Sequence, residues 1–488
     1  MLTTHDLSVP RRAPASTALT DRQLHETLFL TPDATVPDGS VTVAMFLGEA
    51  DLLTRQLPAC RFLALPSRNR LAVATGFAAA QIMGIPALMT AERTLHGLEH
   101  LIQSYPGTTL LLSSSDTDII DLARQQGWTF VVWDMSGASL WTRSPHDIPD
   151  DRIAAIAFTS GSTGNPVAHT KQWRALVDRS RAIGNRFALP TETDAPCNIV
   201  APVPSQHMYG FELSVLLPLH AKAAIWCGPA FYPADITRAL ERIPAPRMLV
   251  CTPLHMRAMQ DAALPVPPLS RTISATAPLS PLLAGGFETR FGTEVHEIYG
   301  ATEIGSFATR RTVAGDNWYL LDGVNLKAAG SMEAGQGGIE IDQPVAQAPF
   351  CPDTPLADIV ALLPDRSFRL IGRQADMIKR GGKRASLAGL SRILSELPGV
   401  EDGTFYLPSY LPSGKTDDAS NLEAKLIALV VAPSCSVTTI MEGLRTRIDP
   451  AFLPRRVVIV EALPRNALGK LPRNAIEDLL HRMNTIAS

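Results

Sequence analysis

The sequence predicts an α/β protein with a large N-terminal domain of mixed and parallel sheets covered by helices, and a small α+β C-terminal domain. Two observations carry this prediction: short apolar runs alternate with helical patterns, and the rhythm changes after about Gly372. The length agrees with it, because 488 residues correspond to roughly three compact units of ordinary size.

The strand-like runs of the first part are short, apolar and separated by helical patterns. They occupy residues 61–66, 108–114, 130–134, 154–160 and 247–253. Helical patterns lie between them at 71–85 and 121–127. This alternation is typical of parallel strands connected by helices.

We place the domain boundary after Arg373, which gives a large domain of residues 1–373 and a small one of residues 374–488. The small domain has its own strand candidates at 403–409, 426–432 and 455–461. The apolar run 426–432 is far too short to span a bilayer and suits a buried strand. We therefore expect no membrane span.

Composition and charge narrow the class of protein. Hydrophobic residues make up 45% of the chain, and its net charge is -3, so no global field attracts nucleic acid or an anionic membrane. The six cysteines form no CxxC pair, which predicts reduced thiols, and the N-terminus lacks the apolar stretch of a signal peptide. These features predict a cytoplasmic enzyme that binds no nucleic acid.

A cluster of hydroxyl groups and glycines directly follows the strand-like run at 154–158. Its members are Thr159, Ser160, Gly161, Ser162, Thr163 and Gly164. Glycine lets a backbone approach phosphates closely, and hydroxyls and N–H groups donate to phosphate oxygens. No Gly-Lys-Ser/Thr closes the loop, so it is not a Walker A motif, and alone it fits either a phosphate loop or an ordinary turn.

A second motif, Tyr299-Gly300-Ala301-Thr302-Glu303, follows the strand-like residues 294–298. A carboxylate beside a phosphate loop is a ligand that Mg²⁺ prefers, and a tyrosine offers a flat face to a purine. Taken alone, the motif fits an exposed strand-to-loop junction better than a site. Two further motifs, residues 370–383 and 464–473, carry lysines beside glycines, and Lys470 is placed to reach into a cleft or to lie in solvent.

In this order and at these separations, the four motifs resemble those of the adenylate-forming superfamily. That group includes acyl- and aryl-CoA synthetases, the adenylation domains of peptide synthetases and luciferases. The resemblance covers residues 153–473. It implies an enzyme that uses ATP and Mg²⁺ to activate a carboxylic acid as its acyl-adenylate, hands the acyl group to a thiol, and has a mobile small domain.

The resemblance also implies roles for individual residues. The loop 159–164, with Thr302, would grip the ATP phosphates, and Glu303 would lie near Mg²⁺. Adenine would lie between Tyr299-Gly300 and the segment 274–278, which contains Ala277. The remaining roles are ribose binding by Asp358, a ribose or phosphate contact by Arg373, a contact beside the acyl carboxylate by His207, and a bridge between carboxylate and phosphate by Lys470.

The chain departs from the family where the phosphate loop ends. The usual lysine is missing, because Val167 follows Pro166. Lys171 either reaches back toward the phosphates or lies on a solvated helix face. The hinge at 374–376 reads Gln-Ala-Asp where the family often has paired acids.

The pocket segments near 207–211, 251–254 and 274–278 are mostly apolar or small, which favours an aromatic or aliphatic acid. Amino-acid-activating relatives carry a Phe-Asp pair, whereas this chain has Phe211-Glu212. The chain also resembles stand-alone AMP-ligases of aryl-polyene and related pigment pathways. The acceptor would then be the phosphopantetheine thiol of an acyl carrier protein or CoA. An amino-acid adenylating enzyme and a non-catalytic nucleotide-binding relative are the alternatives.

Overall fold

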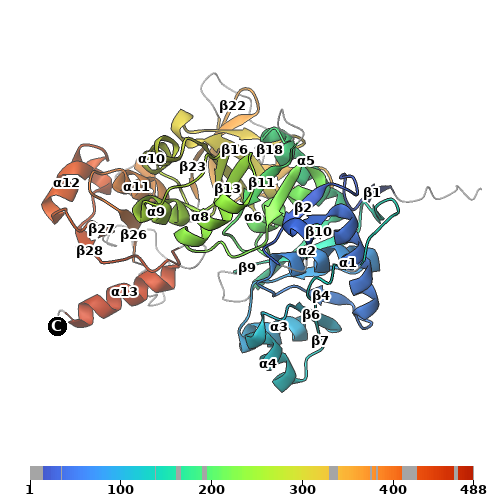
Figure 1. Ribbon diagram of the computed structural model, residues 1–488. Helices are drawn as coiled ribbons and strands as arrows, with labels where there is room; N and C mark the ends of the chain where they lie inside the picture. Colours follow the sequence, from blue (N-terminus) through green and yellow to red (C-terminus); the bar gives the residue numbers. More distant parts are fainter. Residues whose placement is uncertain are drawn as a thin grey trace, which may run out of the picture. The chain divides into compact units, whose positions relative to one another are not determined.

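The structure is a computed structural model that describes residues 15–33, 36–137, 139–160, 166–189, 195–328, 339–373, 376–380, 383–408, 426–465 and 471–486. The chain falls into two compact units (Figure 1). Unit 1 comprises Met1–Asp194 and Pro204–Cys227, and unit 2 comprises Ala195–Val203 and Gly228–Ser488.

Unit 1 is built around a six-stranded sheet in the order β10-β9-β5-β4-β6-β7. All neighbours are parallel except the hairpin β9–β10. Its strands are β4 (Phe62–Ala64), β5 (Ala87–Met89), β6 (Thr108–Leu112), β7 (Phe130–Val132), β9 (Ile153–Ser160) and β10 (Pro166–Gln172). The chain leaves the central strand β4 toward β5 and then crosses to β6 on its other side.

Three helices connect the parallel strands: α2 (Arg70–Met83), α3 (Leu95–Ser104) and α4 (Thr117–Gln126). Asn69 caps α2 by accepting from the N–H groups of Leu71 and Ala72, and Gly84 ends it in the left-handed region at φ 75°. α3 and α4 bury apolar side chains against β4, β5 and β6. This core contains Leu88, Leu98, Leu101, Leu110, Leu112, Ile119, Ile120 and Ala123.

Further elements complete unit 1. Strands β1 (Ser16–Ala18) and β8 (Asp147–Pro149) pair antiparallel, and β12 (Ala223–Trp226), β2 (Thr27–Leu30) and β3 (Ser40–Thr42) form a mixed ladder. Helix α1 (Val43–Gln56) packs on α2. Helix α5 (Trp173–Arg186) packs on α7 (Leu217–His220) and on the π-helical turn η2 (Glu212–Leu216), which follows α6 (Met208–Phe211).

Unit 2 contains a mixed sheet in the order β19-β22-β23-β17-β16-β15-β14-β13-β11. The strands β11, β13, β14 and β15 are parallel and the others antiparallel. Their bounds are β11 (Cys197–Val200), β13 (Arg247–Cys251), β14 (Arg271–Ser274), β15 (Glu294–Ala301), β16 (Gly305–Arg311), β17 (Asn317–Leu320), β19 (Ile339–Asp342), β22 (Asp358–Leu363) and β23 (Ser367–Arg373).

The parallel part of this sheet alternates with helices α8 (Pro233–Arg242), α9 (Pro253–Ala262) and α10 (Pro281–Phe291). A separate antiparallel sheet consists of β18 (Asn325–Lys327), β20 (Val345–Gln347) and β21 (Thr354–Pro355). Short 3-10 turns, η1 (Pro37–Gly39) in unit 1 and η3 (Thr312–Ala314) in unit 2, connect further elements.

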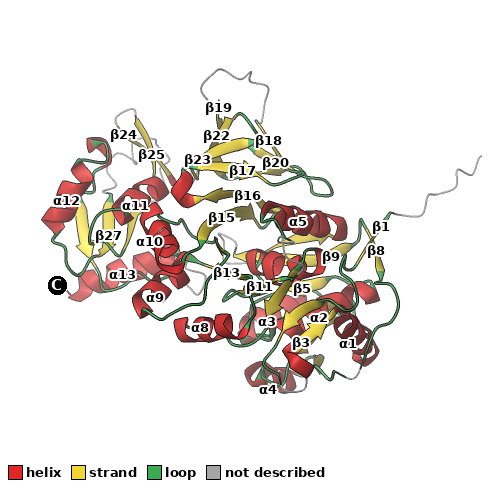
Figure 2. Cartoon of the chain, turned by 45° about the horizontal axis from the view of Figure 1, so that its top comes forward, coloured by secondary structure: helices red, strands yellow, loops and turns green. Residues whose placement is uncertain are grey.

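The C-terminal part of unit 2 has its own sheets and core (Figure 2). The elements are β24 (Met377–Arg380), β25 (Lys383–Ser386), α11 (Leu387–Ser395), β26 (Asp402–Tyr406), β27 (Ile427–Val431), α12 (Val437–Arg445), η6 (Pro450–Phe452), β28 (Arg456–Ile459) and α13 (Arg473–Ile486). Its core includes Leu390, Leu394, Leu426, Ala428 and Ile440. The division into units does not coincide with residue 373, so the domains 1–373 and 374–488 stay a prediction.

The fold class is confirmed, and each strand-like run predicted from the sequence overlaps a strand. The helical pattern at 121–127 is the second half of α4, which begins earlier, at Thr117. Within the described ranges, no helix is long and apolar enough to cross a membrane.

Candidate active site

The hydroxyl-rich loop lies at the tip of the hairpin β9–β10. Thr159 and Ser160 are the last residues of β9, and Ser160 pairs with Pro166 across the hairpin. Residues 161–165, which include Gly161, Ser162, Thr163 and Gly164, lie outside the described residues. The structure therefore places the base of the predicted phosphate loop at the end of β9.

One of the two expectations for Lys171, a place on a solvated helix face, is wrong. It lies on strand β10, opposite Ala155, with only 5% of its surface exposed, so it is not on a solvated helix face. It lies five positions after Pro166 on the strand, which puts the two Cα atoms roughly 16 Å apart. Whether its side chain reaches the phosphates stays a prediction, because residues 161–165 of the loop lie outside the described residues.

His207 stands at the start of helix α6 and caps it. Its carbonyl accepts from the N–H of Phe211 at 2.7 Å. Gly210 leaves no room for a side chain, because an added Cβ would lie 2.0 Å from the carbonyl oxygen of Pro204. The ring of Phe211 turns into the core, 5.0 Å from that of Phe77. Sequence and packing thus hold the 204–210 segment in one tight conformation.

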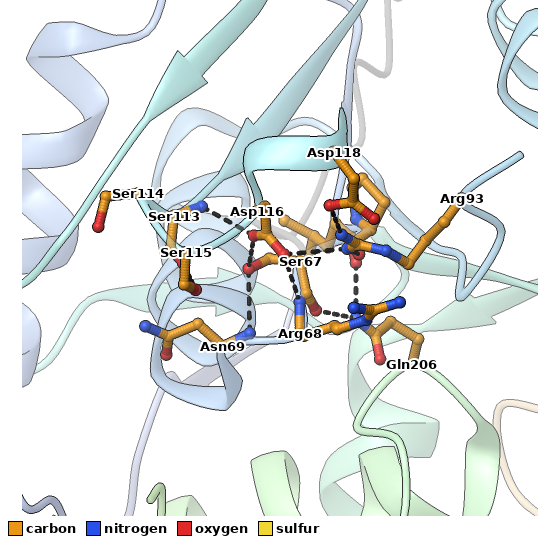
Figure 3. Close-up of polar contacts among 12 residues, drawn as sticks. Ser67, Arg68, Asn69, Arg93, Ser113, Ser114, Ser115, Asp116, Asp118 and Gln206 are labelled. Atoms are coloured by element: carbon orange, nitrogen blue, oxygen red, sulfur yellow. Dashed lines mark hydrogen bonds and ion pairs between the residues drawn. The ribbon is translucent and has the colours of Figure 1, made fainter. Parts of the chain in front are cut away.

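The neighbouring Gln206 anchors this segment to the six-stranded sheet (Figure 3). Its side chain is 7% exposed, and Nε2 donates to the carbonyl oxygens of Leu65, at 3.0 Å, and of Ser67. Both carbonyls follow the carboxyl end of β4. In open α/β sheets, ligands bind at this edge, where the strand order changes direction.

Asp116 in turn fixes the segment that accepts from Gln206 (Figure 3). Its carboxylate accepts from the hydroxyl of Ser67, the N–H groups of Arg68 and Ser113 at 3.1 and 3.0 Å, and Nη1 of Arg93 at 3.0 Å. Burial raises the pKa of Asp116, but these donors and the arginine charge outweigh it and leave the pKa below its usual value. The carboxylate is therefore ionised and structural.

In unit 2, Tyr299 lies on an aromatic base. Its ring centroid is 5.0 Å from that of Phe307, 5.2 Å from that of Trp318 and 6.2 Å from that of Phe368. These three rings are buried, whereas Tyr299 is partly exposed. A partly exposed ring held from below suits the predicted contact with adenine.

The turn after Tyr299 joins strands β15 and β16. A Cβ added to Gly300 would lie 2.6 Å from the carbonyl oxygen of Gly305, so this position requires glycine. Thr302 and Glu303 occupy the turn, and Glu303 is exposed. Mg²⁺ is usually held by one or two carboxylates together with substrate phosphates, and Glu303 fits that role for an ion that arrives with ATP.

The second predicted adenine wall, residues 274–278, begins at the end of β14. Ser274 is fully buried, and Ala277 lies half-buried in the following turn. Thr276 has φ 78°, in the left-handed region where a β-branched residue is strained and where glycine would be at ease. The segment 274–278 contains no glycine, so the backbone at Thr276 is strained.

The two predicted ribose contacts lie side by side. Asp358 begins β22 and Arg373 ends β23, and the two residues pair directly across the antiparallel strands. Asp358 is 6% exposed. The backbone positions of the two residues are therefore direct neighbours in one sheet.

Lys470 belongs to the stretch 466–470, which lies outside the described residues. The chain is fixed on both sides of this stretch. Nε and Nη2 of Arg465 donate to the two carboxylate oxygens of Asp402 at 2.8 and 2.9 Å, and Nη2 of Arg473 donates to the carbonyl oxygen of Leu407 at 3.1 Å. A two-pronged arginine contact of this kind fixes orientation as well as distance.

Sequence reasoning missed the supporting polar residues Asp116, Gln206, Glu297 and Asp402. Only Glu297 had a usable signal, because strand alternation puts it on the same face as Tyr299, two residues later. The partners of the others are far away in the sequence, as with Asp116 and Ser67, so no local spacing marks them.

A family model described as AMP-binding enzyme matches residues 67–328, more than half of the chain. The chain belongs to this family. The match includes the hydroxyl-rich loop, His207 and the motif from Tyr299 to Glu303, and it confirms the resemblance to adenylate-forming enzymes.

Relatives of this AMP-binding enzyme include two proteins named 4-coumarate–CoA ligase. That of Rhodobacter capsulatus is 29% identical over 253 residues, which cover 51% of this chain and 59% of the relative. That of Halorhodospira halophila is 27% identical over 323 residues, covering 64% of this chain and 73% of the relative. The prediction of an AMP-forming acid–thiol ligase agrees with both names.

A solved structure shows the same fold. ATP-bound MatB from Rhodopseudomonas palustris superposes with a TM-score of 0.76 at 18% identity, over 94% of this AMP-binding enzyme and 97% of MatB. The likeness supports the fold class and the presence of a C-terminal domain.

Proposed function

We propose that this AMP-binding enzyme uses ATP and Mg²⁺ to convert an aromatic or aliphatic carboxylic acid into its acyl-adenylate, and then transfers the acyl group to a phosphopantetheine thiol. One observation carries the proposal: the family match over residues 67–328 contains the phosphate loop and the Tyr299–Glu303 motif in the expected order. The names of the relatives support a thiol as the acceptor.

In the first half-reaction, a carboxylate oxygen attacks the α-phosphorus of ATP, a P–O bond forms, and pyrophosphate leaves with the electrons of the broken bond. Two anions must meet, so catalysis consists of positioning and charge neutralisation. We assign these tasks to Lys470 and the N–H groups of the loop 159–164. Mg²⁺, when bound through Glu303, supplies positive charge at the phosphate oxygens.

The other residues position the two substrates. Asp358 and Arg373 would hold the ribose, Tyr299 and the segment around Ala277 the adenine, and His207 the acid. In the second half-reaction, a thiolate attacks the acyl carbonyl, a C–S bond forms and AMP leaves. The small domain 374–488 would rotate between the two steps and withdraw Lys470 to admit the thiol.

The acid is proposed to lack an α-ammonium group. The coumarate relatives favour an aromatic acid, and the predicted pocket segments are small or apolar. The amino-acid alternative depends on Glu212, which is 1% exposed and lies in the π-helical turn η2. The acceptor is CoA or an acyl carrier protein, which present the same thiol.

The test is ATP–pyrophosphate exchange and AMP release with benzoates, cinnamates, fatty acids and amino acids, repeated with Glu212→Gln. We expect exchange with an aromatic or aliphatic acid that tolerates this substitution, and AMP release on adding CoA or a phosphopantetheinylated carrier protein. Exchange with an amino acid that collapses in Glu212→Gln would establish the amino-acid alternative. ATP binding without exchange for any acid would indicate a non-catalytic relative.

A further inference from the structure

A buried carboxylate in unit 2 accepts hydrogen bonds from three residues on two elements and a loop. Glu297 lies on β15 and is 4% exposed. It accepts from Nε of Arg310 on β16 at 2.6 Å and from the hydroxyl of Thr312 in η3 at 2.9 Å. The backbone N–H of Leu279 donates to the same carboxylate.

Two of these connections lead to the residues assigned to adenine. Leu279 directly follows the segment 274–278, so Glu297 holds the end of that segment. Glu297 is also two residues before Tyr299, and residues two apart on a strand project from the same face. One carboxylate therefore ties together the two chain segments assigned to opposite faces of the adenine ring.

Arg310 extends the connection beneath Tyr299. It pairs with Glu297 across β15 and β16, and its Cζ lies 4.7 Å from the centroid of the Trp318 ring. The Trp318 ring is in turn 5.2 Å from that of Tyr299. A planar guanidinium can bind a carboxylate with its edge and stack on an indole with its face, which an ammonium group cannot do.

We propose that the Glu297–Arg310 ion pair positions the adenine-binding residues, by fixing the 274–279 segment through Leu279 and the Tyr299 ring through Trp318. The inference rests on the proposed function, which assigns Tyr299 and the 274–278 segment to adenine. It adds residues that act through others and do not touch the nucleotide.

The energetics agree with a positioning role. The free energy lost when two charges are removed from water is about as large as the free energy gained from their attraction. A buried ion pair therefore adds little stability compared with apolar residues of similar size. What such a pair provides is a defined geometry, because the fork of Arg310 satisfies Glu297 in one orientation. Loss of the pair should therefore change nucleotide recognition more than folding.

The adjacent residue provides a matched control. Arg311 is the next residue on β16 and so projects from the opposite face. It binds Glu288 on α10 at 2.8 and 3.1 Å, and its side chain is 39% exposed. Arg311→Met therefore removes arginine–carboxylate pairs, with Glu288 and with Glu294, from the same strand without touching Glu297 or Trp318.

The experiment compares the binding of ATP and of inorganic tripolyphosphate to the full chain by calorimetry, without any acid. The variants are Arg310→Met, the double variant Glu297→Gln with Arg310→Met, and Arg311→Met. Arg310→Met alone leaves the buried carboxylate of Glu297 without its cationic partner, which could destabilise the fold. The double variant avoids this because it removes both charges. Unfolding midpoints confirm that each variant is folded.

We expect both Arg310 variants to lose ATP affinity by about tenfold, which corresponds to the binding free energy of one base stacked on an aromatic ring. Their affinity for tripolyphosphate should stay within about twofold of that of the unaltered chain. Arg311→Met should leave both ligands unchanged. Equal losses for ATP and tripolyphosphate, or unchanged ATP binding in a folded double variant, would overturn the inference. No ATP binding by the unaltered chain would overturn the proposed function itself, and the inference with it.

Discussion

Asp358 and Arg373 are direct partners across the antiparallel strands β22 and β23. They lie fifteen positions apart in the sequence, yet the ladder makes them direct backbone partners. The family resemblance assigns Asp358 to the ribose and Arg373 to the ribose or a phosphate, and their place as backbone neighbours agrees with these proposed roles.

The first prediction concerns ribose recognition by Asp358. Asp358→Asn keeps the size of the side chain and removes the charge that strengthens its hydrogen bonds, so ATP affinity should fall by about tenfold or more. The preference for ATP over 2′,3′-dideoxy-ATP should fall with it. Calorimetry with both nucleotides measures this, and Asp353→Asn, an exposed position bound to Gln347, is the control. Equal losses for both nucleotides would show that Asp358 does not bind the ribose hydroxyls.

The second prediction separates the two half-reactions. Lys470→Ala should slow acyl-adenylate formation by about 100-fold or more, because one charge-neutralising donor at the transition state is lost. Transfer from supplied acyl-adenylate to the thiol should survive, since it uses a different arrangement of the small domain. Pyrophosphate exchange and thioester formation report the two steps, and Arg482→Ala on α13 is the charge-matched control. Equal losses in both steps would contradict a role confined to the first.

The third prediction concerns the segment that carries His207. Gln206→Leu removes both hydrogen bonds to the carbonyls after β4 and leaves those acceptors buried. We expect the KM for the acid to rise by about tenfold while the KM for ATP changes little. Steady-state kinetics with each substrate varied in turn tests this, with the exposed Gln125→Leu as control. A rise only in the KM for ATP would place Gln206 with the nucleotide instead.

The fourth prediction concerns stability against pH. Burial in α7 lowers the pKa of His220 to about 4, with Arg181 adding to the shift and Asp21 opposing it. Nδ1 lies 3.2 Å from the carbonyl oxygen of Leu216, which can only accept, so the ring is neutral and protonated at Nδ1. Below about pH 6.5, His220 binds a proton in the unfolded chain but not in the folded chain, so the free energy of unfolding falls as the pH falls toward 4.

Between pH 7.5 and 5, this effect amounts to roughly 2 kcal/mol. Urea unfolding at both pH values should therefore show a smaller loss of stability on acidification in His220→Gln than in the unaltered chain. His100→Gln, at an exposed position of α3, should leave the loss unchanged. An identical pH dependence in His220→Gln and the unaltered chain would contradict the assignment.

The local features of this protein were readable from its sequence. Apolar runs and helical spacing located the strands around β4, β6, β9 and β13, because side-chain periodicity reports how an element is buried. The order of the hydroxyl-rich loop, the motif at Tyr299 and the lysine motifs indicated the family, because phosphate binding requires glycines and donors at short spacing. Gly300 followed from the same motif, and the structure adds the reason, a backbone too close for any Cβ.

Tertiary structure decided which distant residues support those motifs. The pairing of Glu297 with Arg310, of Asp358 with Arg373 and of Asp116 with Ser67 depends on strand register and chain crossing, to which local spacing gives no clue. It also decided the place of Lys171. From the sequence, a lysine four positions after Val167 could be a mobile hydrogen-bond donor, whereas the structure shows it buried on strand β10. A sequence specifies its elements through neighbouring residues, whereas the contacts that orient a functional side chain form between segments that only the folded chain brings together.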